Sequence, residues 1–158
     1  MTTLTDIVGY LCKKYPHKSE LSKARVTKMV YLADWKSAKD TGSPVTSIKW
    51  VFNHYGPYVE DVTKAARDDG RFAVNSEWTP YGNRKETISL KSTEANFLVD
   101  APTMKILDDV IEKTKSLNWD AFLKLVYSTY PVLVTDKHST IDLQSIAARY
   151  KRENSAAA

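Results

Sequence analysis

The sequence predicts an α+β fold: a predominantly helical body of about six helices with a small antiparallel sheet of about three strands. Apolar residues recur at the spacing of amphipathic helices over most of the chain. Two stretches, 45–55 and 72–90, instead alternate apolar and polar side chains as strands do. The 158 residues suit one domain. We expect that domain to cover residues 1–152, with a disordered tail over 153–158.

Two helices are predicted at the start of the chain. Thr3 and Asp6 have the spacing of a capping box, in which side chains satisfy free amides at a helix start, and a helix over about 5–15 follows. A longer helix is predicted over about 20–39. Apolar side chains cover so much of its circumference that it should be central and buried. Its other face is expected to carry the basic side chains of Lys23, Arg25, Lys28, Lys36 and Lys39.

The next segment changes to a strand pattern over 45–55. Gly56 and Pro57 are expected to end this strand, because glycine allows a tight turn and proline favours the first turn of a helix. A third helix would then run as far as Gly70, which can adopt the left-handed conformation of a helix C-cap.

A β-hairpin is predicted after the third helix. Strand patterns over 72–78 and 84–90 flank the segment from Pro80 to Asn83, whose composition favours a turn. Together with the strand at 45–55, this hairpin would complete the small antiparallel sheet.

Three more helices are predicted in the C-terminal part. Asp100 and Asn118 are residue types that cap helix N-termini, and Pro131 lies beyond the expected end of the second of these helices. Ser139 and Asp142 have capping-box spacing and should begin the last helix.

Residues that usually carry catalysis or bind metals are scarce in the sequence. The chain has one cysteine and three histidines, and none of them has the spacing of a zinc site. No glycine-rich phosphate-binding motif occurs. Glu60, Asp61 and Lys64 are the nearest approach to a catalytic cluster, but acids are favoured at helix starts and Glu60–Lys64 is an ordinary i,i+4 pair. We therefore predict a protein that is not an enzyme and uses no metal or cofactor.

Hydropathy and charge narrow the range of partners. No apolar stretch approaches the roughly 20 residues that span a bilayer, no signal-peptide pattern is present, and the single Cys12 cannot form an internal disulfide. We expect a cytoplasmic protein without membrane contact. The net charge is +4, and residues 1–40 hold eight Lys/Arg against four Asp/Glu, which favours an acidic partner there.

The segment 53–58 is the most unusual part of the sequence, because it gathers an imidazole and two phenols around a Gly-Pro turn. It either shapes the turn only or forms an aromatic recognition surface, since tyrosine and tryptophan are enriched at interfaces. Asp34 lies among apolar residues and is either hydrogen-bonded internally or an interface charge. The candidate partner-binding residues are Tyr31, Asp34, Trp35, Trp50, His54, Tyr55, Gly56, Pro57 and Tyr58.

Three motifs, taken in their order, resemble the Panacea domain of SocA-like antitoxins and phage-associated proteins. Residues 26–35 (VTKMVYLADW) are similar to the family's KLLYLAD helix, residues 41–45 (TGSPV) to its TG-x-P-I turn, and residues 51–57 to its strand ending in YGP. The resemblance covers about residues 5–130. The chain departs from the family at 127–132 (YSTYPV), where many members carry a His and a nearby Pro-Trp.

The resemblance implies an antitoxin that neutralises a cognate toxin protein, encoded by an adjacent gene, by direct contact. A transcription-associated regulator that binds DNA through the hairpin and the basic helix is an alternative, although the acidic third helix would be repelled by phosphates. A protease adaptor, or a phage-encoded antagonist of the host, is a third reading that the sequence does not separate from the first.

Overall fold

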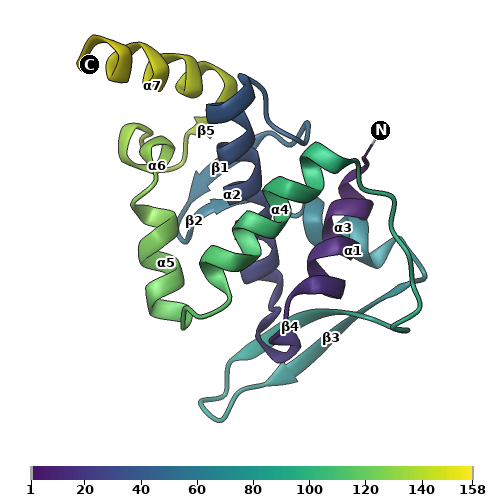
Figure 1. Ribbon diagram of the computed structural model, residues 1–158. Coiled ribbons are helices and arrows are strands. Elements are labelled where there is room, and N and C mark those ends of the chain that lie inside the picture. Colours follow the sequence, from purple (N-terminus) through teal and green to yellow (C-terminus); the bar gives the residue numbers. More distant parts are fainter. Residues whose placement is uncertain (1, 158) are drawn as a thin grey trace.

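The computed structural model describes residues 2–157 and confirms the α+β prediction (Figure 1). The described chain forms seven α-helices, a three-stranded antiparallel sheet and a separate two-stranded hairpin. The helices are α1 (Leu4–Lys14), α2 (Lys23–Thr41), α3 (Asp61–Arg67), α4 (Ala101–Thr114), α5 (Trp119–Tyr127), α6 (Tyr130–Val134) and α7 (Leu143–Ala157), with a 3₁₀ turn at Lys18–Glu20. The strands are β1 (Trp50–Asn53), β2 (Gly56–Tyr58), β3 (Phe72–Trp78), β4 (Arg84–Leu90) and β5 (Thr140–Ile141).

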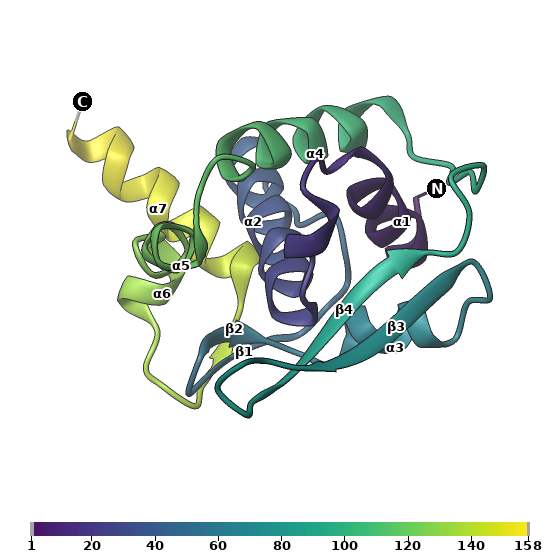
Figure 2. The ribbon, with the colours of Figure 1, turned by 90° about the horizontal axis from the view of Figure 1, so that it is seen from below.

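Helix α2 is the centre of the molecule, as its broad apolar distribution predicts. Ser22 caps it by accepting a hydrogen bond from the amide of Arg25 at 3.1 Å. Gly42, with a φ of 89°, ends it in the left-handed conformation, which glycine adopts without steric cost. Helices α1, α3, α4 and α7 all pack against α2 (Figures 1 and 2). Thirteen of the nineteen residues of α2 are therefore buried, polar ones included.

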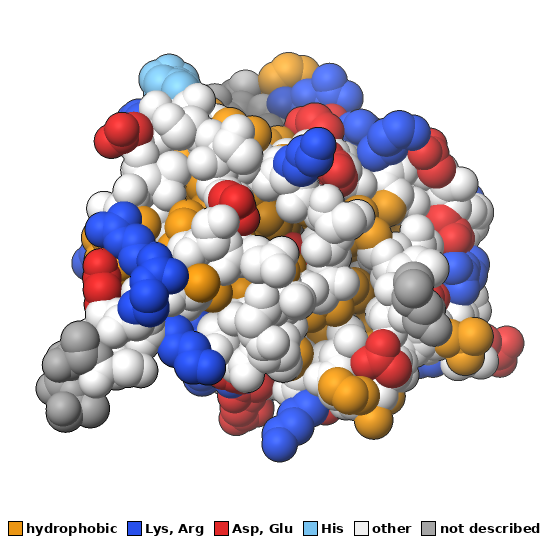
Figure 3. All heavy atoms as spheres, turned by 90° about the horizontal axis from the view of Figure 1, so that it is seen from above, with side chains coloured by type: hydrophobic (Ala, Val, Ile, Leu, Met, Phe, Trp, Pro, Cys, Tyr) orange, Lys and Arg blue, Asp and Glu red, His pale blue; other side chains and the backbone are white. Residues whose placement is uncertain are grey.

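The basic outer face predicted for this helix does not exist as one exposed stripe. Arg25 and Lys28 are only 2% and 1% exposed. Lys36 forms ion pairs with Asp40 at 3.2 Å and Asp109 at 3.5 Å. Because tertiary packing surrounds the helix on all sides, two of its cations are turned inward. On the face shown in Figure 3, basic and acidic side chains are interspersed rather than segregated.

The segment after β1 differs from the prediction that Gly56 and Pro57 start a helix. The chain turns back at once, and β2 pairs antiparallel with β1 through Asn53 opposite Gly56. The turn forms because Asn53 Oδ1 accepts the amide of Tyr55 at 2.9 Å and Gly56 adopts a φ of 91°. Pro57 is tolerated in β2 because this is an edge strand of the sheet. Helix α3 begins only at Asp61 and is capped by Asp68, so the C-cap predicted at Gly70 is also wrong.

The three-stranded sheet has the order β2-β1-β5 and does not include the predicted hairpin. Strands β3 and β4 pair with each other from Phe72–Leu90 to Trp78–Arg84 and pack against α1 and α3. The third strand of the sheet is instead the two-residue β5, which pairs with Trp50 and Val51. A strand this short has no alternation that a sequence pattern could reveal.

The C-terminal part differs from the prediction in one cap, in an additional short helix and in its end. Asp142 rather than Ser139 caps α7, since its carboxylate accepts the amide of Ser145 at 3.2 Å and Ser139 is used to pair with β1. Pro131 lies beyond the end of α5, as predicted, but it belongs to the first turn of a further short helix, α6, that the sequence pattern does not predict. Helix α7 extends to Ala157 and so includes most of the expected tail. No helix of the described residues is long and apolar enough to cross a membrane.

Candidate functional site

The nine predicted partner-binding residues divide into a buried group and a group around a pocket. Tyr31, Asp34, Trp35 and Trp50 are at most 5% exposed and belong to the core. The Tyr31 and Trp50 rings meet edge to face at 5.6 Å between centroids, an arrangement typical of packed aromatic pairs. The structure therefore places these four side chains in the core rather than on an exposed surface.

Asp34 holds the sheet against the central helix. Its carboxylate accepts hydrogen bonds from the amide of Thr46 at 2.8 Å, from the hydroxyl of Thr46 at 2.5 Å and from the indole nitrogen of Trp50 at 2.9 Å. Burial raises the pKa of Asp34 above its ordinary value, although these donated hydrogen bonds lower it. Of the two roles that the sequence left open for this acid, the internal hydrogen-bonded one is observed.

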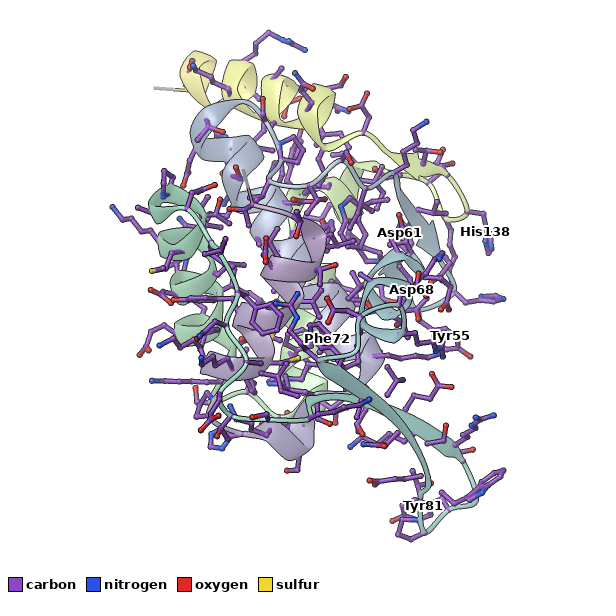
Figure 4. All side chains as sticks on the ribbon, turned by 90° about the vertical axis from the view of Figure 1, so that its right-hand side faces the viewer. Tyr55, Asp61, Asp68, Phe72, Tyr81 and His138 are labelled. Atoms are coloured by element: carbon purple, nitrogen blue, oxygen red, sulfur yellow. The ribbon has the colours of Figure 1, made fainter. Side chains whose placement is uncertain are left out.

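The other predicted residues lie at or beside a pocket between α2, the β1–β2 hairpin and α5. The cavity measures about 410 Å³, within the range typical of binding pockets. Tyr55 is 76% exposed at its mouth, and Figure 4 shows this side chain projecting outward on the same side of the molecule as His138. The lining residues are Lys23, Ala24, Lys28, Asn53, Tyr55, Tyr58, Glu60, Trp119, Leu123 and Tyr127.

Lys28 is the most unusual member of this lining. Its side chain is 1% exposed, and its ammonium donates one long hydrogen bond, of 3.4 Å, to the carbonyl oxygen of Pro57. The ammonium also lies 5.5 Å from the centre of the Tyr58 ring, close enough for a cation–π interaction. Burial lowers the pKa of Lys28 to about 8. Among the described residues, no carboxylate forms an ion pair with Lys28.

Four of the ten lining residues of the pocket are aromatic. Trp119 is 41% exposed and stacks on Phe122 with 5.7 Å between centroids. A side-chain carbon at Gly56 would lie 3.3 Å from the Tyr127 ring, so glycine is what lets Tyr127 approach the hairpin. The Tyr58 hydroxyl donates to Glu60 at 3.1 Å, and burial together with this acid raises the pKa of Tyr58 to about 12.

His54, Gly56 and Pro57 are the remaining predicted partner-binding residues, and they lie in the β1–β2 hairpin. His54 is exposed and faces His138, with 5.3 Å between ring centroids. Gly56 and Pro57 are buried, and the backbone of Pro57 supplies the acceptor for Lys28. The hairpin therefore contributes to the pocket through its backbone and through Tyr55 and Tyr58.

The cluster that most resembled a catalytic site is differently arranged from the expectation. Lys64 pairs with Asp68 at 2.6 Å instead of with Glu60, because Glu60 accepts from Tyr58. Between residues 2 and 157, no three His, Cys, Asp or Glu side chains gather closely enough to hold a metal ion.

A second cavity, of about 440 Å³, lies further along α2, toward its C-terminal end, and is also lined by α4, α5, α6 and α7. Trp35 stacks there on Tyr130 with 6.3 Å between centroids. Two of its cations have carboxylate partners, since Lys36 and Lys113 both pair with Asp109. This cavity therefore lacks the unpaired buried cation that distinguishes the pocket at Lys28.

Sequence reasoning missed Lys28, Trp119 and Tyr127 as pocket residues. Lys28 was assigned to an outer basic face, and a helical pattern alone does not show that a lysine points inward. Trp119 and Tyr127 come from α5, about 90 residues further along the chain, and only the tertiary fold brings them to α2. The one sequence feature that pointed to Tyr127 was the departure from the family pattern at 127–132.

An α+β domain built around one buried helix, with an aromatic pocket over its first turns, is the class of structure that these observations define. A family model described as "Antitoxin SocA-like, Panacea domain" matches residues 26–131, which is more than half of the chain. The chain therefore belongs to the SocA-like antitoxin family with a Panacea domain. The match includes every lining residue of the pocket except Lys23 and Ala24. No curated protein and no solved structure matches this chain.

Proposed function

We propose that this chain is an antitoxin that neutralises a cognate toxin by direct contact. The observation that carries this proposal is its membership of the SocA-like antitoxin family over residues 26–131. The exposed rings around the pocket supply the kind of surface that such contact needs, because aromatic side chains offer a large contact area at low entropic cost.

Further exposed rings lie at the tip of the β3–β4 hairpin. Trp78 and Tyr81, at the tip of the β3–β4 hairpin, are 75% and 91% exposed. Figure 4 shows Tyr81 at the far end of the hairpin, away from the helical body. These two rings offer a partner a second exposed aromatic surface, and tyrosine and tryptophan are enriched at interfaces.

The charges around the hairpin do not favour the alternative of DNA binding. Arg67 pairs with Glu86 at 2.8 Å, and Arg84 lies 3.8 Å from the same carboxylate group. Helix α3, the candidate for the DNA groove, begins with Asp61 and ends at Asp68. A DNA-binding surface requires cations that are free to replace phosphate counterions, so paired arginines and acidic helix ends argue against it.

Co-expression with the neighbouring genes tests the proposal. Each adjacent open reading frame is expressed alone from an inducible promoter, and one of them should arrest growth. Expression of this chain should restore growth, and the two purified proteins should co-elute from a sizing column. If the chain fails to rescue growth arrest caused by any neighbour, the antitoxin proposal is wrong.

The lifetime of the toxin separates a plain inhibitor from a protease adaptor. Direct inhibition predicts that the toxin has the same half-life with and without this chain after protein synthesis is blocked. An adaptor would shorten that half-life while still binding the toxin.

A further inference from the structure

The ammonium of Lys28 is a buried cation whose hydrogen-bonding capacity is mostly unused. An ammonium has three N–H donors, and the described residues supply one acceptor, the Pro57 carbonyl oxygen at 3.4 Å. The nearby Arg25 is equally buried, but it donates to Tyr15, Thr114 and Leu117 at 2.7–2.9 Å. Burial of a charge without a partner is costly, so Lys28 is poised for an acceptor that the chain does not itself provide.

The other charges at the pocket do not fill this role. Lys23 is engaged with Glu86 at 3.6 Å. Glu60 accepts the hydroxyl of Tyr58 and forms no ion pair with Lys28. Apart from Asn53, the remaining wall is made of aromatic and apolar side chains, notably Tyr55, Trp119, Leu123 and Tyr127. An occupant of this pocket therefore meets one buried positive charge without an ion-pair partner and a wall that is mainly aromatic and apolar.

We propose that this pocket receives an acidic side chain of the toxin, an aspartate or glutamate carboxylate that bonds to Lys28, together with an adjacent apolar side chain that packs on Trp119 and Tyr127. This inference rests on the proposed function. A carboxylate carries one negative charge and accepts the spare N–H donors, forming a charge-assisted hydrogen bond. The apolar neighbour covers the rings at the mouth, as at other interface hot spots.

A phosphate group fits the pocket less well than a carboxylate. A terminal phosphate carries up to two negative charges and three acceptor oxygens, and recognition of phosphate usually relies on arginine or on several backbone amides. The lining contains one unpaired buried cation, no arginine, and the carboxylate of Glu60. Charge complementarity therefore favours a protein partner with an acidic anchor.

Short peptides test the pocket without knowledge of the toxin. The probes are Ac-Leu-Glu-Leu-NH₂ and its matched neutral control Ac-Leu-Gln-Leu-NH₂, titrated to 10 mM against the ¹⁵N-labelled chain while the indole signal of Trp119 is followed. The glutamate peptide should shift that signal at a concentration at least five-fold lower than the glutamine peptide. An equal response to both peptides, or no response to either, overturns the proposal.

Two further probes separate other sources of negative charge. Ac-Leu-Gln-OH presents a C-terminal carboxylate, and inorganic phosphate presents a phosphoryl group. Stronger binding of either than of the glutamate peptide would overturn the assignment of the pocket to an acidic side chain.

Variants extend the test to the toxin itself. Lys28→Met should weaken toxin binding by about 30-fold or more, because truncating one member of a buried charge pair typically has an effect of this size. Trp119→Ala, at a half-exposed position, should also weaken it. Lys39→Met is the matched control, since Lys39 lies on the same helix over the Trp35 ring and outside this pocket. Unchanged toxin binding by Lys28→Met would overturn the pocket inference and leave the antitoxin proposal intact. Failure of the wild-type chain to bind the product of any neighbouring gene would refute the antitoxin proposal itself.

Discussion

Replacing Lys28 with methionine should stabilise the free protein. Burial lowers the pKa of Lys28 from its ordinary 10.5 to about 8. Since one pKa unit corresponds to about 1.4 kcal/mol, the charged lysine costs the fold about 3 kcal/mol at pH 7. Methionine has a similar length without the charge, but it leaves the carbonyl of Pro57 without its donor, a loss of about 1 kcal/mol. The net gain in unfolding free energy should therefore be about 2 kcal/mol, or roughly 4–8 °C in Tm.

The pH dependence of this gain identifies its cause. The pKa of Lys28 is lower in the folded state than in the unfolded state. Between pH 8 and 10.5 the unfolded chain therefore binds one more proton than the folded chain. The unfolding free energy of the wild type consequently increases as the pH rises through this window. The variant lacks this group. The excess unfolding free energy of Lys28→Met over the wild type should have its full value below pH 8 and should disappear toward pH 10.5.

Urea denaturation of both proteins at pH 7 and at pH 10 measures the difference directly. Groups that face Lys28, namely Lys23, Tyr55, Tyr58, Glu60 and Tyr127, are present in both proteins, so their titration largely cancels in the comparison. A Lys28→Met protein that is less stable than the wild type at pH 7, or an advantage that does not change with pH, would refute the reasoning.

Three other perturbations test separate parts of the structure. Asp34→Ala leaves the Thr46 and Trp50 donors unsatisfied and should lower the unfolding free energy by about 3–5 kcal/mol in urea; a loss under 1 kcal/mol would show that these bonds do not hold the sheet. Gly56→Ala should destabilise the protein more than Gly82→Ala, because both glycines have positive φ but only Gly56 faces a ring at 3.3 Å. Equal losses of about 1–2 kcal/mol, the cost of the backbone conformation alone, would contradict that contact. Burial raises the pKa of Cys12 to about 12, so a thiol reagent at pH 8 should modify it only after unfolding, and rapid labelling of the native chain would contradict its burial.

The helices were predictable because their signals are local. The capping box of Thr3 and Asp6 is present, and Asp100 and Asn118 cap α4 and α5 as expected. The long α2 was recognisable because its apolar residues occupy most of its circumference.

The errors in the sheet have a physical cause. A Gly-Pro pair is compatible with a helix start and with a hairpin edge strand alike, and the pairing of Asn53 with Gly56 decides between them. Strand β5 has two residues, which are too few to show the alternation of apolar and polar side chains that marks a strand. Its partner in β1 lies about 90 residues away in the sequence, so only the folded chain reveals it.

The candidate site was predictable in part. The aromatic hairpin at 53–58 was recognised because its composition is unusual, and it does line the pocket through Tyr55 and Tyr58. The rings of α2 could not be assigned to core or surface from their spacing, since a helix buried on all sides has no face that marks the interior. The inward turn of Lys28 follows from the packing of α5 and the hairpin over the start of α2, which is a tertiary property.

A crystal structure of this chain bound to the toxin from its own operon is the most direct test of the account. We predict an aspartate or glutamate oxygen of the toxin at about 2.7–2.9 Å from Lys28 Nζ, with the rings of Tyr55 and Trp119 covered by the toxin. A complex in which this pocket remains open to solvent would contradict it.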